Sequence, residues 1–204
     1  MDENKTLLQR AIEFAVAAHE KTFRKKSTTP YIVHPIEVMK IVCRITDDEE
    51  VRAAAVLHDT VEDTFVTKEM IEEQFGERVA ALVASESENK REGIPQKDTW
   101  IIRKQETLDH LKTASLETKI ICLGDKLANM RDIYREYRNI GDSLWGIFNA
   151  PDKGKGPAGK AENICWYYSG IVEELKDDLS GTMAWKELNE LVQKTWEKEE
   201  NNAS

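Results

Sequence analysis

The segment AAAVLHDTVEDT, residues 53–64, places one histidine and three carboxylates within six residues, directly after an apolar run. On a helix, which turns about 100° per residue, the four polar side chains share one side and the apolar residues occupy the other. Carboxylates are costly to bury unless they are paired or bind a metal. A solvated helix face explains Glu62 and Asp63, but it does not explain the adjacent pair His58 and Asp59. We therefore interpret this segment as part of a metal site.

Two further segments favour this interpretation, because a metal needs ligands from more than one element. His34 lies directly before Pro35 in PYIVHPIEV, at the expected start of a helix, where its imidazole can project freely. Asp125 follows the apolar stretch IICLG and shares one helix face with Asn129 and Asp132. A single aspartate of this kind is often a surface residue, and only the combination of the three segments indicates a ligand.

The elements that must position these residues are helices. Apolar residues recur at intervals of three and four, and alternating β-branched runs are scarce, so the fold class is predicted to be all-α. We expect Thr67 to cap one helix at its start, Gly76 to end that helix, and Ser115 to begin a long helix. The expected helices cover residues 4–23, a segment from about residue 35, 49–62, 67–75, 77–88, 99–113, a long segment after 115, 141–149, 160–179 and 182–199.

Length and composition limit the possibilities further. The chain has 204 residues, of which 40% are hydrophobic, and this suits one globular domain over residues 1–204. The formal net charge of -9 argues against a sequence-wide surface for nucleic acid or anionic membrane, so an anionic ligand requires a local basic patch. No stretch approaches the roughly 18 apolar residues of a membrane span. Three cysteines without a CxxC motif argue against disulfides and a thiolate zinc site, and we expect a cytoplasmic location.

One segment interrupts the helical pattern. Residues 150–163, APDKGKGPAGKAEN, contain three glycines, two prolines and three lysines, which predicts a flexible loop. The loop is either an exposed connector or a basic lid that reaches toward a phosphorylated ligand. A disordered tail is expected over residues 197–204.

The spaced residues His34, His58, Asp59 and Asp125 resemble the ligand signature of the HD-domain phosphohydrolases. The strings PYIVHPIEV, AAAVLHDTVEDT, IEEQFGERVAALV and LGDKLANMRDI are similar to the hydrolase domain of RelA/SpoT-type alarmone enzymes, especially the small alarmone hydrolases. The likeness spans about residues 5–180 in the same order. It implies a single HD-type helical bundle of about 8–10 helices with a metal site in a central cleft.

The resemblance also implies an activity in the stringent response. The expected reaction hydrolyses guanosine tetra- or pentaphosphate at the 3′ position and yields GDP or GTP and pyrophosphate, with one Mn²⁺ per chain. Two imidazoles and two carboxylates suit Mn²⁺, Fe²⁺ or Zn²⁺ and leave positions for water and a phosphate oxygen. Glu62 and Asp63 follow one helical turn after the His-Asp pair, where one of them can transfer a proton. We favour Glu62.

A polyanionic substrate also needs cations, and the segment FRKKS lies just upstream of His34. In the relatives, a basic-basic-serine string at this distance contacts the nucleotide, although Lys25 here occupies the usual arginine position. A solvated charge run at a helix end is the alternative. The predicted substrate-binding residues are Arg24, Lys25, Lys26, Ser27, Asn129 and Arg131.

Two other functions stay open at this point. HD folds also hydrolyse nucleoside monophosphates, cyclic nucleotides and NADPH-like compounds, and one sequence does not identify the base. A nucleotide sensor without turnover is the third possibility, and the acidic residues Glu62 and Asp63 argue against it. The resemblance implies a small guanine nucleotide as partner rather than nucleic acid or membrane, and the sequence leaves open whether the chain is a monomer or a homodimer.

Overall fold

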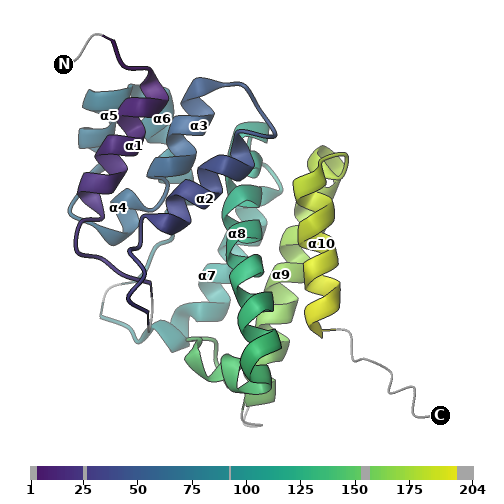
Figure 1. Ribbon diagram of the computed structural model, residues 1–204. Helices are drawn as coiled ribbons and strands as arrows, with labels where there is room; N and C mark the ends of the chain where they lie inside the picture. Colours follow the sequence, from purple (N-terminus) through teal and green to yellow (C-terminus); the bar gives the residue numbers. More distant parts are fainter. Residues whose placement is uncertain (1–3, 25–26, 92, 153–156, 197–204) are drawn as a thin grey trace. The chain divides into compact units, whose positions relative to one another are not determined.

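The computed structural model describes residues 4–24, 27–91, 93–152 and 157–196 (Figure 1). Over these residues the chain forms ten α-helices and one 3-10 helix, and the single β-bridge joins Phe23 to Pro30. The predicted all-α class is therefore confirmed. The helices are α1 (Leu7–Ala18), α2 (Val33–Val42), α3 (Glu49–Leu57), α4 (Thr60–Asp63), α5 (Lys68–Phe75), α6 (Glu77–Glu86), α7 (Gln96–Leu111), α8 (Leu116–Ile140), the 3-10 helix η1 (Gly141–Ile147), α9 (Pro157–Leu179) and α10 (Met183–Trp196).

The chain divides into two compact units. The first contains Met1–Asn89 and Thr113–Ala128, and the second contains Lys90–Lys112 and Asn129–Ser204. The long helix α8 contributes residues to both. One HD-type domain over residues 1–204, with its metal site in a central cleft, stays a prediction.

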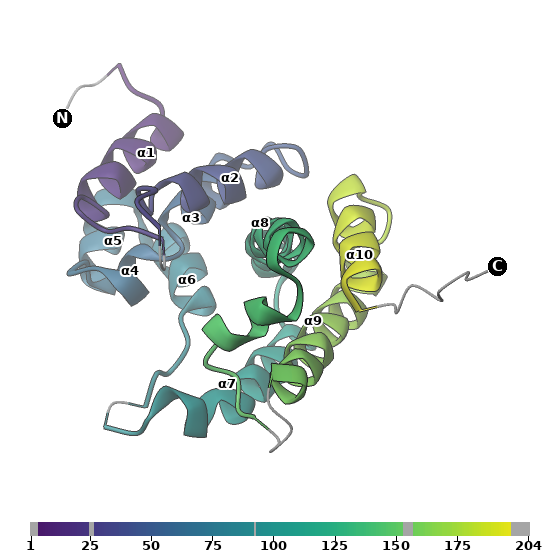
Figure 2. The same cartoon turned by 60° about the horizontal axis from the view of Figure 1, so that its bottom comes forward.

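Helix α3 is the centre of the first unit. Helices α1, α2 and α6 all pack against it (Figures 1 and 2). Its residues Ala53, Ala54 and Ala55 are completely buried, as is Leu57 at its end. Small side chains let neighbouring helices approach closely, so the alanine run makes α3 the element around which the first unit is built.

The expected helix ends are confirmed where hydrogen-bonding side chains define them. The Thr67 hydroxyl accepts from the backbone N–H of Met70 at 3.3 Å, and Ser115 accepts in the same way from Thr118 at 3.2 Å. Gly76 ends α5 with a φ of 92°, a conformation that L side chains rarely adopt.

The predicted helix over residues 49–62 is wrong in one respect, since it is interrupted at His58 and Asp59. Helix α3 ends at Leu57 and α4 begins at Thr60. The Thr60 hydroxyl donates to the carbonyl of Leu57 at 2.6 Å, and Nδ1 of His58 lies 2.9 Å from the carbonyl of Ala55. These side chains compete with the backbone for the last carbonyls of α3 and satisfy them without a continuous helix.

Gly124 brings α8 close to α2. A Cβ at this position would lie 2.9 Å from Cγ2 of Val42, 3.2 Å from Cγ1 of Val38 and 3.3 Å from the Val38 carbonyl oxygen. Asp125 is the next residue and His34 lies in the first turn of α2, so we expect this close contact to influence the separation between their side chains.

Replacing Gly124 with alanine is expected to destabilise the protein by about 1–3 kcal/mol, since the added methyl overpacks a completely buried contact. It should also weaken divalent-metal binding, because Asp125 moves away from His34. Thermal unfolding and metal titration test both effects. Gly146→Ala is the matched control, since a Cβ there meets nothing within 4 Å; equal behaviour of the two variants would contradict the prediction.

In the second unit, α9 packs against α7, η1 and α10. Trp145, Tyr167 and Tyr168 are buried there, whereas the neighbouring Trp166 is exposed. The segment expected as a helix over residues 141–149 is the 3-10 helix η1, and α9 begins three residues earlier than expected, inside the predicted loop 150–163. Residues 153–156 of that loop and the predicted tail 197–204 lie outside the described residues.

None of the helices in the described part of the chain combines the length and apolar content that a bilayer span requires.

Candidate metal centre

Three predicted ligands meet in the first unit. One potential ligand atom from each of His34, His58 and Asp59 lies within 4.8 Å of the others. Oδ2 of Asp59 is 3.1 Å from Nε2 of His58 and 3.6 Å from Nε2 of His34. Helix α2 supplies His34 from its first turn, and the junction between α3 and α4 supplies the other two residues. The interruption of the helix thus places both members of the His-Asp pair toward the same point.

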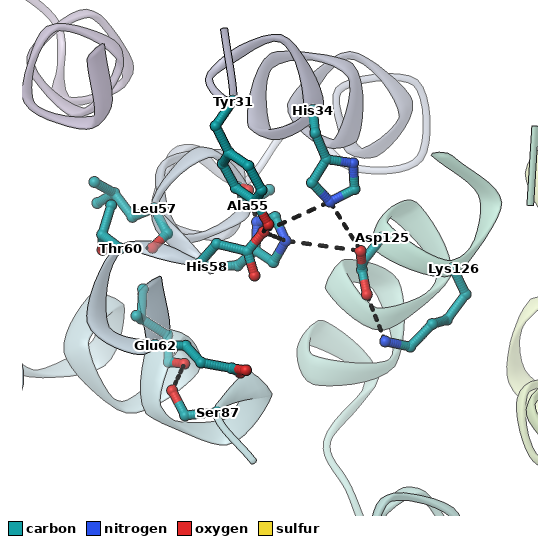
Figure 3. A network of polar contacts seen from close by, with 12 residues as sticks. Tyr31, His34, Ala55, Leu57, His58, Thr60, Glu62, Ser87, Asp125 and Lys126 are labelled. Atoms are coloured by element: carbon teal, nitrogen blue, oxygen red, sulfur yellow. Dashed lines mark hydrogen bonds and ion pairs between the residues drawn. The ribbon is translucent and has the colours of Figure 1, made fainter. Parts of the chain in front are cut away.

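Asp125 approaches the same two imidazoles from α8. Its Oδ1 is 3.1 Å from Nε2 of His34 and 3.8 Å from Nε2 of His58. Its other oxygen, Oδ2, accepts from the ammonium group of Lys126. The structure therefore brings together all four residues predicted as metal ligands, and Figure 3 shows Asp125 on the α8 side of the histidines.

The hydrogen bonding of His58 suits a metal ligand. Its Nδ1 lies 2.9 Å from the backbone carbonyl of Ala55, so this nitrogen carries the proton in that bond. Its Nε2 is buried and has no geometrically acceptable hydrogen bond within the described structure. Oδ2 of Asp59 lies 3.1 Å away and forms an ion-pair contact with this nitrogen rather than a hydrogen bond of acceptable geometry. A buried, unsatisfied imidazole nitrogen that faces carboxylates is an arrangement that a divalent cation fits.

The charges in this centre depend strongly on one another. Burial by itself lowers the pKa of His58, but the carboxylates of Asp59 and Asp125 outweigh it and hold the pKa well above its ordinary value. Burial raises the pKa of Asp59, whereas the histidines, His58 first, bring the pKa down to about 2. Lys126 and both histidines likewise hold the pKa of Asp125 well below its ordinary value despite burial. Without a metal, protons thus compensate the buried carboxylates, and a divalent cation would replace them.

A pH-dependent stability follows from the raised pKa of His58. Its stabilising contribution is fully present below the unfolded value of 6.5 and is lost as the pH rises through the folded pKa. In the presence of a chelator, the difference in melting temperature between the wild type and His58→Gln should therefore decrease as the pH rises. The comparison with the variant is needed because burial lowers the pKa of His19. The contribution of His19 to stability therefore increases as the pH rises, opposite to that of His58. A difference that stays constant or grows with pH would contradict this expectation.

The two predicted catalytic acids lie on α4, beside the histidines. Glu62 is half-buried, and its Oε2 accepts from the backbone N–H of Glu88 at 3.4 Å. Figure 3 shows Glu62 near Ser87, the residue that directly follows α6. Asp63 is exposed, and its negative charge acts to raise the pKa values of His19 and Tyr31. Their catalytic roles stay predictions.

A third acid near the centre was missed by the sequence analysis. Burial raises the pKa of Glu86, at the end of α6, to about 7, although Lys126 acts in the opposite direction. The charge of Asp125 also raises the pKa of this carboxyl group, and the charge of His58 lowers it. An acid with such a pKa can carry a proton at neutral pH. Its sequence context, ASESENK, is mostly polar and lies at a helix end, so it gives no signal that this carboxyl group is half-buried near the centre.

The predicted substrate-binding residues lie in different parts of the chain. The guanidinium carbon of Arg24 lies 5.6 Å from the centre of the Tyr31 ring, and the Ser27 hydroxyl donates to the Thr29 hydroxyl at 2.9 Å. Asn129 and Arg131 belong to the second unit, where Arg131 forms two 2.7 Å bonds to the Glu187 carboxylate. Lys25 and Lys26 lie outside the described residues. Substrate contact stays a prediction for all six.

Tyr31 was also missed as a component of the centre. Its hydroxyl donates to Oδ2 of Asp59 at 2.8 Å. Burial, followed by the charge of Asp59, raises the pKa of the phenol, so that it keeps its proton as a hydrogen-bond donor. The only sequence signal was its place in PYIVHP, three residues before His34.

The fold and this cluster define an all-α protein with a site that can hold a divalent metal, and comparison with known proteins gives the family. The family model of the HD domain matches residues 11–149. The chain belongs to the HD domain family.

Individual relatives support the same assignment. The chain is 38% identical over 139 residues to a Xenopus tropicalis protein named guanosine-3′,5′-bis(diphosphate) 3′-pyrophosphohydrolase MESH1, covering 66% of this chain and 74% of that protein. It is 37% identical over 133 residues to an Aquifex aeolicus guanosine-3′,5′-bis(diphosphate) 3′-pyrophosphohydrolase, covering 62% of this chain but only 18% of that protein. A solved structure described as a metazoan ortholog of SpoT that hydrolyzes ppGpp aligns with a TM-score of 0.72 at 25% identity, over 95% of this chain and 98% of that one. The predicted resemblance is confirmed.

Proposed function

We propose that this chain is a guanosine-3′,5′-bis(diphosphate) 3′-pyrophosphohydrolase that binds one Mn²⁺ through His34, His58, Asp59 and Asp125. The observation that carries the proposal is the cluster of His34, His58 and Asp59, whose ligand atoms lie within 4.8 Å of one another. It occurs in a chain that covers 74% of a relative named for this reaction. The imidazole and carboxylate donors suit Mn²⁺ as well as Fe²⁺ and Zn²⁺.

The reaction transfers a diphosphate group to water. The oxygen of water forms a bond to the phosphorus at the 3′ position, the bond between that phosphorus and the 3′ oxygen breaks, and pyrophosphate leaves. A bound divalent cation would supply a Lewis acid that polarises the phosphoryl group and promotes ionisation of the attacking water. The attacking water loses a proton, and the 3′ oxygen of the product gains one to become a hydroxyl.

The side chains on α4 are suited to move these protons. Glu62 lies one helical turn after His58 and Asp59, and its oxygen holds a position set by the backbone of Glu88. In our proposal Glu62 accepts the proton of the attacking water, and Asp63 assists in returning a proton to the 3′ oxygen. Arg24 contacts the nucleotide together with Lys25, Lys26 and Ser27, while Asn129 and Arg131 contact the ribose and a phosphate.

The proposal is tested by incubating the purified, Mn²⁺-loaded chain with guanosine tetraphosphate and measuring pyrophosphate release. GDP, which lacks the 3′ diphosphate, is the matched substrate control and should release none. Nucleoside monophosphates, a cyclic nucleotide and NADPH complete the panel. No pyrophosphate from the tetraphosphate, with turnover of another nucleotide in the panel, would overturn the proposed substrate but retain a metal-dependent phosphohydrolase.

A further inference from the structure

Tyr31 makes a contact that the proposed reaction has not used. Its hydroxyl donates to Oδ2 of Asp59 at 2.8 Å, and this same oxygen faces Nε2 of both His58 and His34. The hydrogen bond therefore acts on the Asp59 oxygen that faces both imidazoles. Carboxylates that bind metals are commonly oriented in this way by a neighbouring donor.

The position of the phenol is itself determined by several contacts. The backbone N–H of Tyr31 donates to the carbonyl of Thr22 at 2.9 Å, and this bond holds the backbone of Tyr31 beside the segment that follows α1. Its ring centre is 5.0 Å from that of His19 and 6.1 Å from that of His34. The ring is therefore held by His19 at the end of α1 and by His34 in α2, and the backbone of Tyr31 is held by Thr22.

His19 supports the ring by packing. Both nitrogens of this buried imidazole lack a hydrogen-bond partner in the described structure, so no hydrogen bond sets its orientation. Its ring is tilted by 33° against that of Tyr31, close to a stacked arrangement. His19 therefore lies against the ring of Tyr31.

The ring of Tyr31 also contacts a predicted nucleotide-binding residue. The guanidinium carbon of Arg24 lies 5.6 Å from the ring centre, within the range of cation-π attraction. Tyr31 thus has two separable parts. Its hydroxyl contacts a predicted metal ligand, and its ring contacts the predicted substrate-binding arginine.

We propose that Tyr31 is a positioning residue, whose hydroxyl orients Asp59 toward the bound cation and whose ring holds Arg24 for the nucleotide. This inference rests on the proposed metal site, but it concerns a residue outside the predicted ligands and acids. Removal of the hydroxyl alone should impair the first role and spare the second. Removal of the whole ring should impair both.

The experiment compares Tyr31→Phe with Tyr31→Ala in the full chain. Mn²⁺ affinity is measured by competition with a chelator, without nucleotide. Loss of a residue that orients a metal ligand typically reduces affinity about 10- to 100-fold, and this is the effect expected for Tyr31→Phe. KM for the tetraphosphate, measured at saturating Mn²⁺, should stay near the wild-type value in Tyr31→Phe and rise in Tyr31→Ala.

The matched control is Tyr137→Phe, the same chemical change in a residue whose ring packs 5.4 Å from Trp145 in the second unit. It should leave Mn²⁺ affinity unchanged. Wild-type Mn²⁺ affinity in Tyr31→Phe would overturn the inference, as would a loss of affinity matched by a general drop in the melting temperature of the metal-free protein. If the wild type binds Mn²⁺ but releases no pyrophosphate, the proposed function fails, whereas the affinity comparison still decides the role of Tyr31.

Discussion

Replacing His58 with alanine is expected to abolish retention of a divalent metal and, with it, pyrophosphate release. Nε2 of His58 is buried and lies 3.1 Å from Asp59 and 3.8 Å from Asp125, so it links the two carboxylates. Without this imidazole the site loses a nitrogen ligand for the metal. When no metal is bound, it also loses a cationic partner for the two carboxylates. Metal analysis after gel filtration and the pyrophosphate assay measure the two losses.

The fold of the His58→Ala variant should persist. The buried residues of α3, among them Ala53, Ala54 and Leu57, are unchanged, and Asp125 keeps its bond to Lys126. We therefore expect a cooperative thermal transition at a modestly changed temperature. His110→Ala, a change in an exposed histidine of α7, is the control and should retain metal. One equivalent of metal bound to His58→Ala would show that the cluster is not the binding site.

Glu62→Gln is expected to lower turnover by about 10²- to 10⁴-fold, the range typical of general acid-base groups, while metal stays bound. Glutamine has nearly the same shape, and its side-chain oxygen can still accept the hydrogen bond from the N–H of Glu88. The variant therefore removes the basic carboxylate with little change in structure. Single-turnover kinetics at saturating Mn²⁺ isolate the chemical step.

Glu72→Gln, at an exposed position of α5, is the matched control and should behave as the wild type. Unchanged turnover in Glu62→Gln would exclude this residue as the base. Asp63 and Glu86 would then be tested next, since one follows Glu62 on α4 and the other has a pKa raised to about 7 by burial.

The helical class, several helix ends and the types of residue in the centre were predictable from the sequence. Hydrophobic spacing and capping are local properties, so Thr67, Gly76 and Ser115 could be assigned their roles without knowledge of the fold. The His-Asp pair was recognisable because two polar residues followed a run that had to be buried. These inferences use neighbours only a few residues apart.

The tertiary structure alone decided how the residues of the centre meet. The helical pattern continues through His58 and Asp59, so the interruption became visible only with the side-chain bonds to the carbonyls of Ala55 and Leu57. Tyr31 bonds to Asp59 across 28 positions, and His34 meets Asp125 across 91. Such distant pairs depend on how α2, α3 and α8 pack, which local preferences do not specify. The raised pKa of Glu86 has the same origin, because burial at a helix end results from the surrounding elements and not from the residue itself.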